Sequence, residues 1–200
     1  MGVHIDRTLS FSPHIATIAS KARARCAIFL KSFISRDMKT MLKFYTTYVR
    51  PILEYGSVVW CPVSSKDINI LENVQRFFTN KITGCTYLPY SQRLSILSLH
   101  SLHHRRIVSD LATLHSLVSG NLLLSLTPHM NHTPPSITRG HNLKIDIPTM
   151  RYVSSKQNFI SRTASYWNSL PLSVLSATSN SSFRHRITKS LFDPHLPSTT

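Results

Sequence analysis

The chain has 200 residues, of which 23 are Lys or Arg and 8 are Asp or Glu, giving a formal charge of +15 at neutral pH. The apolar share of 42% is enough for a core, and it argues against both a chain disordered throughout and a membrane protein; the length favours one compact domain with at most a trailing subdomain. Five glycines are too few for a turn-rich barrel or sandwich or for a glycine-rich phosphate loop, so we expect an all-α fold, a helical bundle.

The predicted elements are a short strand-like start at 2–5 and then a series of helices. Serine, aspartate or proline marks most helix starts, and Gly84 and Gly120 mark two of the ends. We expect helices, in chain order, at about 12–33, 37–50, 52–60, 65–83, 91–97, 101–119, 154–169 and 181–192. Pro51 is expected to interrupt the helical run between the second and the third.

The 3.6-residue period assigns a buried and an exposed side to these helices. The first would bury a stripe made of Ile15, Ile18, Ala22, Cys26, Phe29 and Phe33. The second would bury Met38, Met41, Leu42, Tyr45, Tyr48 and Val49. In the fourth, Phe77 belongs to the apolar stripe, while Glu72 and Arg76 form an exposed i, i+4 pair. Arg105 and Arg106 would face away from the core.

The composition changes along the chain and suggests five segments. These are a short N-terminal segment at 1–10, a helical domain at 11–126, a linker at 127–150 that is rich in Pro, His, Thr and Asn, a helical extension at 151–192 and a disordered tail at 193–200.

No catalytic or metal site is predicted. The eight acidic residues include no adjacent pair and none at i, i+3 or i, i+4. This pattern argues against reactions that need two neighbouring carboxylates, such as two-metal catalysis or glycoside hydrolysis. The thiols are too far apart in sequence for a Cys-x-x-Cys spacing and fit a reducing compartment: Cys26, Cys61 and Cys85. Three histidines have helical spacing: His100, His103 and His104. They adjoin two arginines, which would repel a metal cation. Serine-nucleophile and nucleotide-loop motifs are not found.

The sequence shows no export signal at its start, and its longest apolar stretch, at 122–126, is far too short to cross a bilayer. We therefore expect an intracellular protein, in the cytoplasm or the nucleus.

The excess of positive charge predicts a polyanionic partner. Nucleic acid is favoured, an anionic membrane comes second, and a protein that is merely basic is the plain alternative. The candidate nucleic-acid contacts are Lys21, Arg23, Arg25, Lys31, Lys39, Lys43, Arg50, Arg76, Arg105 and Arg106. Three aromatic residues lie among these lysines and arginines in the sequence: Tyr45, Tyr48 and Phe77. They would either stack on nucleotide bases or belong to the core.

Several stretches, taken in order, carry one family resemblance. They are residues 48–60 (YVRPILEYGSVVW), 71–76 (LENVQR), 83–84, 105–111, 139–141 and 167–171 (WNSLP). Together they resemble the thumb region of reverse transcriptases from non-LTR retrotransposons (LINE, jockey-like), over about residues 1 to 192.

The resemblance implies a helical thumb and C-terminal connection that hold template and primer, with residues 1–10 as a remnant of the palm's end. The palm aspartates of that family are not found here, so we expect a truncated polymerase fragment with no catalytic activity, metal or cofactor; Mg²⁺ would belong to the missing palm. The expected partners are RNA or an RNA/DNA template-primer, bound without sequence preference, and the missing polymerase segment, but no membrane. The alternatives are a co-opted helical protein-interaction module and a decayed reading frame with no selected function.

Overall fold

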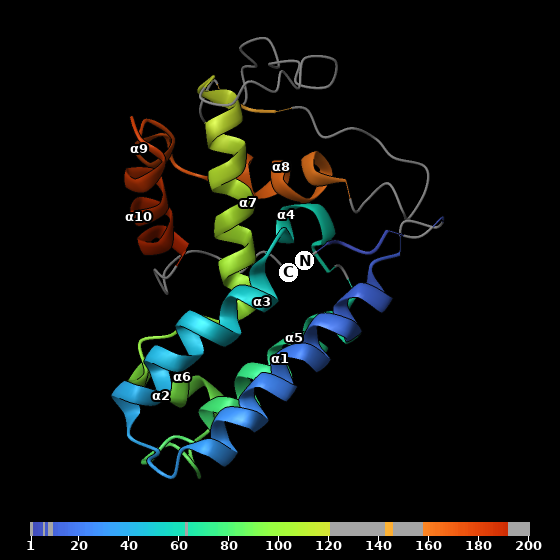
Figure 1. Ribbon diagram of the computed structural model, residues 1–200. Coiled ribbons are helices and arrows are strands. Elements are labelled where there is room, and N and C mark those ends of the chain that lie inside the picture. Colours follow the sequence, from blue (N-terminus) through green and yellow to red (C-terminus); the bar gives the residue numbers. More distant parts are fainter. Residues whose placement is uncertain are drawn as a thin grey trace. The chain divides into compact units, whose positions relative to one another are not determined.

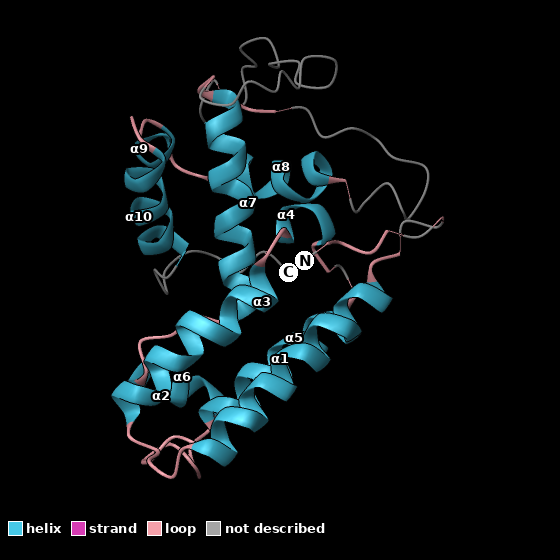
Figure 2. Cartoon of the chain, viewed as in Figure 1, coloured by secondary structure: helices cyan, strands magenta, loops and turns pink. Residues whose placement is uncertain are grey.

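Figure 1 shows the chain as a computed structural model, which describes residues 2–5, 7, 10–62, 64–120, 143–145 and 158–190 and the backbone of 191. The regular elements of the described residues are helices, which confirms the predicted all-α class (Figure 2). The expected strand at 2–5 is not formed, since these residues adopt no regular structure. Among the described helices, none combines the length and the apolar character that a bilayer crossing requires.

The chain divides into two compact units, Met1–Arg106 and Ile107–Thr200. The division falls inside α7 (Leu102–Val118). The reason is that the bonding partners of α7 change along its length: Leu102 and Arg106 bond to residues of the first unit, whereas Asp110 bonds to a residue of the second. The expected tail at 193–200 lies outside the described residues, as does the expected linker apart from 143–145.

The first unit is built from short and long helices. These are α1 (Ser12–Ser32), α2 (Met38–Phe44), the π-helical turn η1 (Tyr45–Val49), α3 (Arg50–Glu54), α4 (Ser57–Trp60), α5 (Ser65–Thr79) and α6 (Tyr90–Ile96).

The α2, η1 and α3 segments follow one another without a break, so the prediction that Pro51 interrupts the helical run is wrong. Proline lacks an N–H, and its ring clashes with the carbonyl group four residues earlier in a regular α-helix. The π-helical turn lies directly before Arg50 and Pro51, and its wider i→i+5 geometry accommodates the ring.

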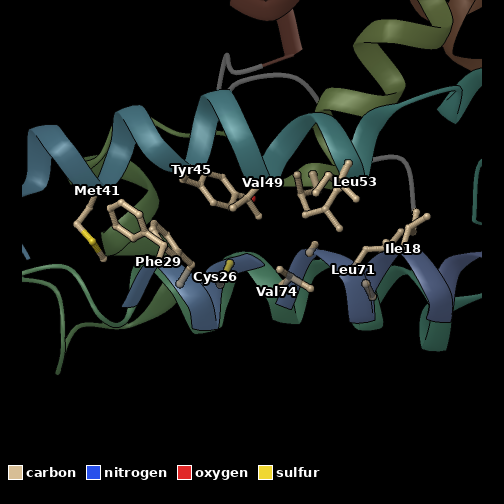
Figure 3. Packing of buried hydrophobic residues seen from close by; sticks show 14 of the residues in the cluster. Ile18, Cys26, Phe29, Met41, Tyr45, Val49, Leu53, Leu71 and Val74 are labelled. Atoms are coloured by element: carbon tan, nitrogen blue, oxygen red, sulfur yellow. The ribbon is translucent and has the colours of Figure 1, made fainter. Parts of the chain in front are cut away.

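The core of the first unit lies between this continuous run and α1 and α5, which pack against each other. Figure 3 shows Met41, Tyr45, Val49 and Leu53 pointing toward the side chains of α1 and α5. Cys26 is fully buried in this core, and desolvation raises the pKa of its thiol to about 12, so the group stays a neutral thiol at physiological pH.

Some apolar residues that the periodicity assigns to this core are on the surface. Phe33 is 51% exposed, Tyr48 55% and Phe77 38%, and the exposure of Met38 is similar to that of Phe77. Ile82, which the pattern assigns to the fourth helix, lies instead in the turns after α5, although it is fully buried.

The second unit contains the later part of α7 with α8 (Phe159–Ser169), α9 (Leu172–Leu175) and α10 (Asn180–Leu191). His115 stacks on Phe183 with ring centroids 4.3 Å apart, and Trp167 lies beside the same ring. Trp167 Nε1 donates to the carbonyl of Leu143 at 2.8 Å, and Asn168 forms two hydrogen bonds with the backbone of Ile145. Residues 143–145 are thus packed against α8, although the composition assigns them to a linker.

Candidate nucleic-acid interface

The described acidic side chains of the first unit are engaged within the fold or at a helix cap. They are Asp37, Glu54, Asp67 and Glu72. Asp67 is buried and accepts a hydrogen bond from Ser12 Oγ at 2.7 Å. Asp37 caps α2 by accepting the Thr40 N–H at 2.9 Å, and this bond holds the pKa of Asp37 below its usual value. Few carboxylates of the first unit therefore remain to neutralise the positive charge of its exposed lysines and arginines.

Glu72 is 4% exposed, so the predicted surface pair with Arg76 is wrong. Its carboxylate accepts the N–H of Leu102, at 3.1 Å for Oε2, and the hydroxyl of Tyr90. Burial and this carboxylate raise the pKa of Tyr90. A negative charge at the N-terminus of α7 is also favourable for the helix dipole. Glu72 thus joins α5, α6 and α7 instead of facing water.

Glu54 binds two of the predicted contact residues. The guanidinium of Arg105 donates to both carboxylate oxygens, with Nη2 at 3.1 Å from Oε2, and Arg50 Nε lies 3.8 Å from the same oxygen. The hydrogen bond to Glu54 raises the pKa of Arg105, whereas burial and the nearby Arg105 lower the pKa of Arg50. Both arginines are partly buried; Arg105 joins the start of α7 to α3, whereas Arg50 pairs with Glu54 within α3.

Arg106 is 1% exposed, so the prediction that it faces away from the core is wrong. Its Nη2 donates to the carbonyl of Leu53 at 3.3 Å, and its guanidinium carbon lies 5.6 Å from the ring centre of Trp60. Burial lowers its pKa. A side chain enclosed in this way is not placed to contact a phosphate at the surface, so the prediction that Arg106 contacts nucleic acid is not supported.

α1 exposes four of the predicted contacts: Lys21, Arg23, Arg25 and Lys31. Lys21 and Arg25 are at i and i+4 and therefore share one flank of the helix. Arg23 is two residues from each of them and lies on the other flank, and Lys31 lies opposite the buried stripe. These charges are spread around the exposed side of α1 and are not gathered on a single face.

α2 and η1 combine exposed bases with an exposed ring. Lys39 and Lys43 are exposed one helical turn apart, and Tyr48 follows in the next turn. The Tyr48 ring stacks on Phe44 with centroids 5.6 Å apart, and Phe44 stacks on Phe29 of α1 at 3.6 Å. The prediction that these rings belong to the core is confirmed for Tyr45, which is fully buried, and is wrong for Tyr48.

Arg76 is exposed, and its guanidinium carbon lies 5.0 Å from the ring centre of Tyr90. A further basic residue, which the sequence analysis missed, lies just after the C-terminal end of α5. Lys81 is exposed, with its Nζ 5.8 Å from the ring centre of Phe77. Its position four residues after Phe77, just before Gly84, is the signal that could have identified it.

The described residues contain no cluster of three or more His, Cys, Asp or Glu that could hold a metal ion. Within the histidine group at the start of α7, the rings of His100 and His104 are 5.4 Å apart, and burial lowers the pKa of His104 to about 4.

Two known proteins are similar to part of this chain. One is an uncharacterized protein of Caenorhabditis elegans, 29% identical over 123 residues, which are 60% of this chain and 62% of that protein. The other is a probable RNA-directed DNA polymerase from the transposon X-element of Drosophila melanogaster, 29% identical over 90 residues, which are 44% of this chain and 10% of the polymerase. No family model matches the chain, and no solved structure matches it.

The chain thus spans less than two thirds of the length of either relative. The similarity to a transposon polymerase supports the family resemblance over less than half of the chain. The assignment to a thumb and to the jockey-like group of elements stays a prediction.

Proposed function

We propose that this chain is a thumb-like part of a transposon reverse transcriptase, and that its first unit binds the backbone of an RNA or RNA/DNA duplex without reading its sequence. The observation that carries the proposal is the separation of charge in this unit. Its described acids are engaged in packing and capping, while Lys21, Lys39 and Lys43 stand exposed beside further bases. Such a surface attracts phosphates through their charge and through counterion release.

The partial similarity to a transposon polymerase supports the choice of partner. The exposed Tyr48, five residues after Lys43, adds a ring that can stack on a nucleotide base where a strand is unpaired. In this proposal the chain holds nucleic acid, and phosphoryl transfer belongs to a separate polymerase segment whose carboxylates bind Mg²⁺.

A protein-interaction module is the second candidate. It is favoured by two neighbouring apolar residues directly after α1, since Phe33 is 51% and Ile34 95% exposed. The two proposals differ in their dependence on charge, because apolar docking would be insensitive to salt and to the loss of lysines.

The proposal is tested with the double variant Lys39→Gln and Lys43→Gln in the full chain. We expect weaker binding to an RNA/DNA duplex and a salt dependence that is shallower by about 2 in the slope of log K against log salt, because two phosphate contacts are lost. Fluorescence anisotropy with duplexes of different sequence measures both quantities.

The matched control is the double variant Arg184→Gln and Lys189→Gln, which removes the same charge from exposed positions of α10. We expect little change in the salt slope for this control. An equal loss in the two double variants would show that net charge alone attracts the duplex and would contradict a binding surface on α2.

A further inference from the structure

A cavity of about 330 Å³ opens in the first unit, away from the Lys39 and Lys43 surface of α2. Its walls come from the N-terminal segment, one side of α1 and the end of α3. The lining residues are Gly2, Val3, His4, His14, Thr17, Ile18, Lys21, Ile52 and Tyr55. The volume is at the lower end of the range for small-molecule sites, about 300 to 1,000 Å³.

His14 is the most enclosed polar group in this cavity wall, at 4% exposure. Its Nδ1 accepts the backbone N–H of His4 at 3.3 Å, and the Trp60 ring meets its ring edge-on with centroids 5.3 Å apart. Because Nδ1 is the acceptor, the proton of the neutral imidazole lies on Nε2, which makes that nitrogen a hydrogen-bond donor.

The polar part of the cavity favours an anion. Lys21 brings an ammonium group to the lining, while His4 and His14 bring two imidazoles with centroids 6.4 Å apart. Burial lowers the pKa of His14, and the nearby His4 and Lys21 lower it further, so His14 is a neutral hydrogen-bond donor here. None of the lining residues that the structure describes is acidic.

The remaining lining is apolar or aromatic. Ile18 and Ile52 form part of the wall, and the Tyr55 side chain is 57% exposed, which leaves its ring accessible to a planar group. An anion that carries a ring or a sugar can therefore place its charge on Lys21 and His14 and its less polar part on these side chains.

We propose that this cavity binds a phosphate monoester of the size of a nucleoside 5′-monophosphate. The phosphate would accept hydrogen bonds from Lys21 Nζ and His14 Nε2, and the nucleoside would pack on Tyr55 and Ile52. Two sources share this chemistry, a free nucleotide and the 5′-phosphorylated end of a strand. The second source rests on the proposed nucleic-acid function, whereas the first does not.

The test is calorimetric titration of the full chain with adenosine 5′-monophosphate, adenosine and inorganic phosphate. We expect the nucleotide to bind at least about tenfold more tightly than either of its parts, because the cavity contacts both. Lys21→Gln should weaken nucleotide binding about tenfold or more, since it removes a charged hydrogen bond. Equal binding of nucleotide and nucleoside, or an unchanged Lys21→Gln variant, would overturn the proposal.

Two further variants keep the test independent of folding and of general charge. Lys189→Gln removes an exposed charge of α10 that does not line the cavity, and it should change nucleotide affinity by less than about twofold. Thr17→Trp fills the cavity from an exposed position and should abolish nucleotide binding while the variant keeps its helical circular dichroism. Nucleotide binding that persists in Thr17→Trp would overturn the location of the site.

Single-stranded oligonucleotides with a 5′-phosphate or a 5′-hydroxyl distinguish the two sources. A preference for the phosphorylated end that Thr17→Trp removes would identify a strand end, whereas nucleotide binding without that preference would identify a free nucleotide. Salt-dependent duplex binding by Thr17→Trp tests the proposed function separately, because the Lys39 and Lys43 surface is intact in this variant. A failure of the cavity proposal is therefore distinguishable from a failure of the proposed function.

Discussion

A buried acid illustrates how polar residues serve the fold in this protein. Glu72 accepts hydrogen bonds from the Tyr90 hydroxyl and the Leu102 N–H, and neighbouring Gln75 bonds to Tyr45, Tyr90 and the carbonyl of His100. This network connects the continuous α2–η1–α3 run with α5, α6 and the start of α7. Both residues belong to the LENVQR stretch that carries the family resemblance, so this stretch supports the architecture.

At this scale we predict that Glu72→Ala lowers the free energy of unfolding by about 2–4 kcal/mol, because a buried hydroxyl and a helix N-terminus lose their acceptor. Glu72→Gln keeps one acceptor oxygen and should lose less. Urea denaturation followed by circular dichroism measures both. A Glu72→Ala variant as stable as the unaltered chain would show that the carboxylate does not hold these elements together.

At the scale of elements, the ends of helices were predictable where a side chain forms the cap. Ser64 accepts the Asp67 N–H at 3.0 Å and begins α5 where the sequence indicates. Helix faces were less predictable, because the periodicity does not reveal which polar residue finds a partner far away in sequence. The sequence pattern places Arg106 on the surface, whereas in the fold its guanidinium contacts the carbonyl of Leu53 and the ring of Trp60.

For the candidate interface, the exposure of Lys21, Lys39 and Lys43 was predictable because unpaired ammonium groups are costly to bury. Their distribution was not predictable, since it depends on where α1 and α2 pack. The cavity beside His14 was also missed, because its walls come from three segments that only the fold brings together.

The cap of α5 gives a prediction for a single element. Ser64→Ala should reduce the free energy of unfolding by about 1 kcal/mol, since one N–H at the helix start loses its acceptor. Ser65→Ala, at an exposed neighbouring position, should be close to neutral. Thermal denaturation compares the two; a larger loss for Ser65→Ala would show that the capping assignment is wrong.

At the scale of the whole molecule, the histidines make stability depend on pH in one direction. Burial lowers the pKa of five of them below the usual value of 6.5: His14, His100, His103, His104 and His115. The unfolded chain therefore takes up protons before the folded chain does as the pH falls. The stability contribution of these neutral histidines is complete above about pH 6.5 and is lost during acidification.

We predict that the free energy of unfolding decreases as the pH falls from about 6.5 toward 4, the range over which His104 should remain neutral in the folded chain. His104 contributes at most about 3 kcal/mol to this decrease in the free energy of unfolding, and the partial solvent exposure of its ring makes the contribution smaller. Urea denaturation at a series of pH values measures the decrease. His104→Gln should make it smaller, whereas replacing the exposed His185 by Gln should not, and a stability that rises on acidification would contradict the assignment.

In the proposed function, the first unit holds a polyanion through its exposed lysines and arginines, while its described acids are engaged within the fold or at a cap. The most direct measurement is the affinity of the full chain for an RNA/DNA duplex across salt concentrations from about 50 to 200 mM. We predict a linear fall of log K with log salt, with a slope between about −2 and −5 and little dependence on duplex sequence. Absence of binding at the lowest salt, or binding that does not respond to salt, would contradict it.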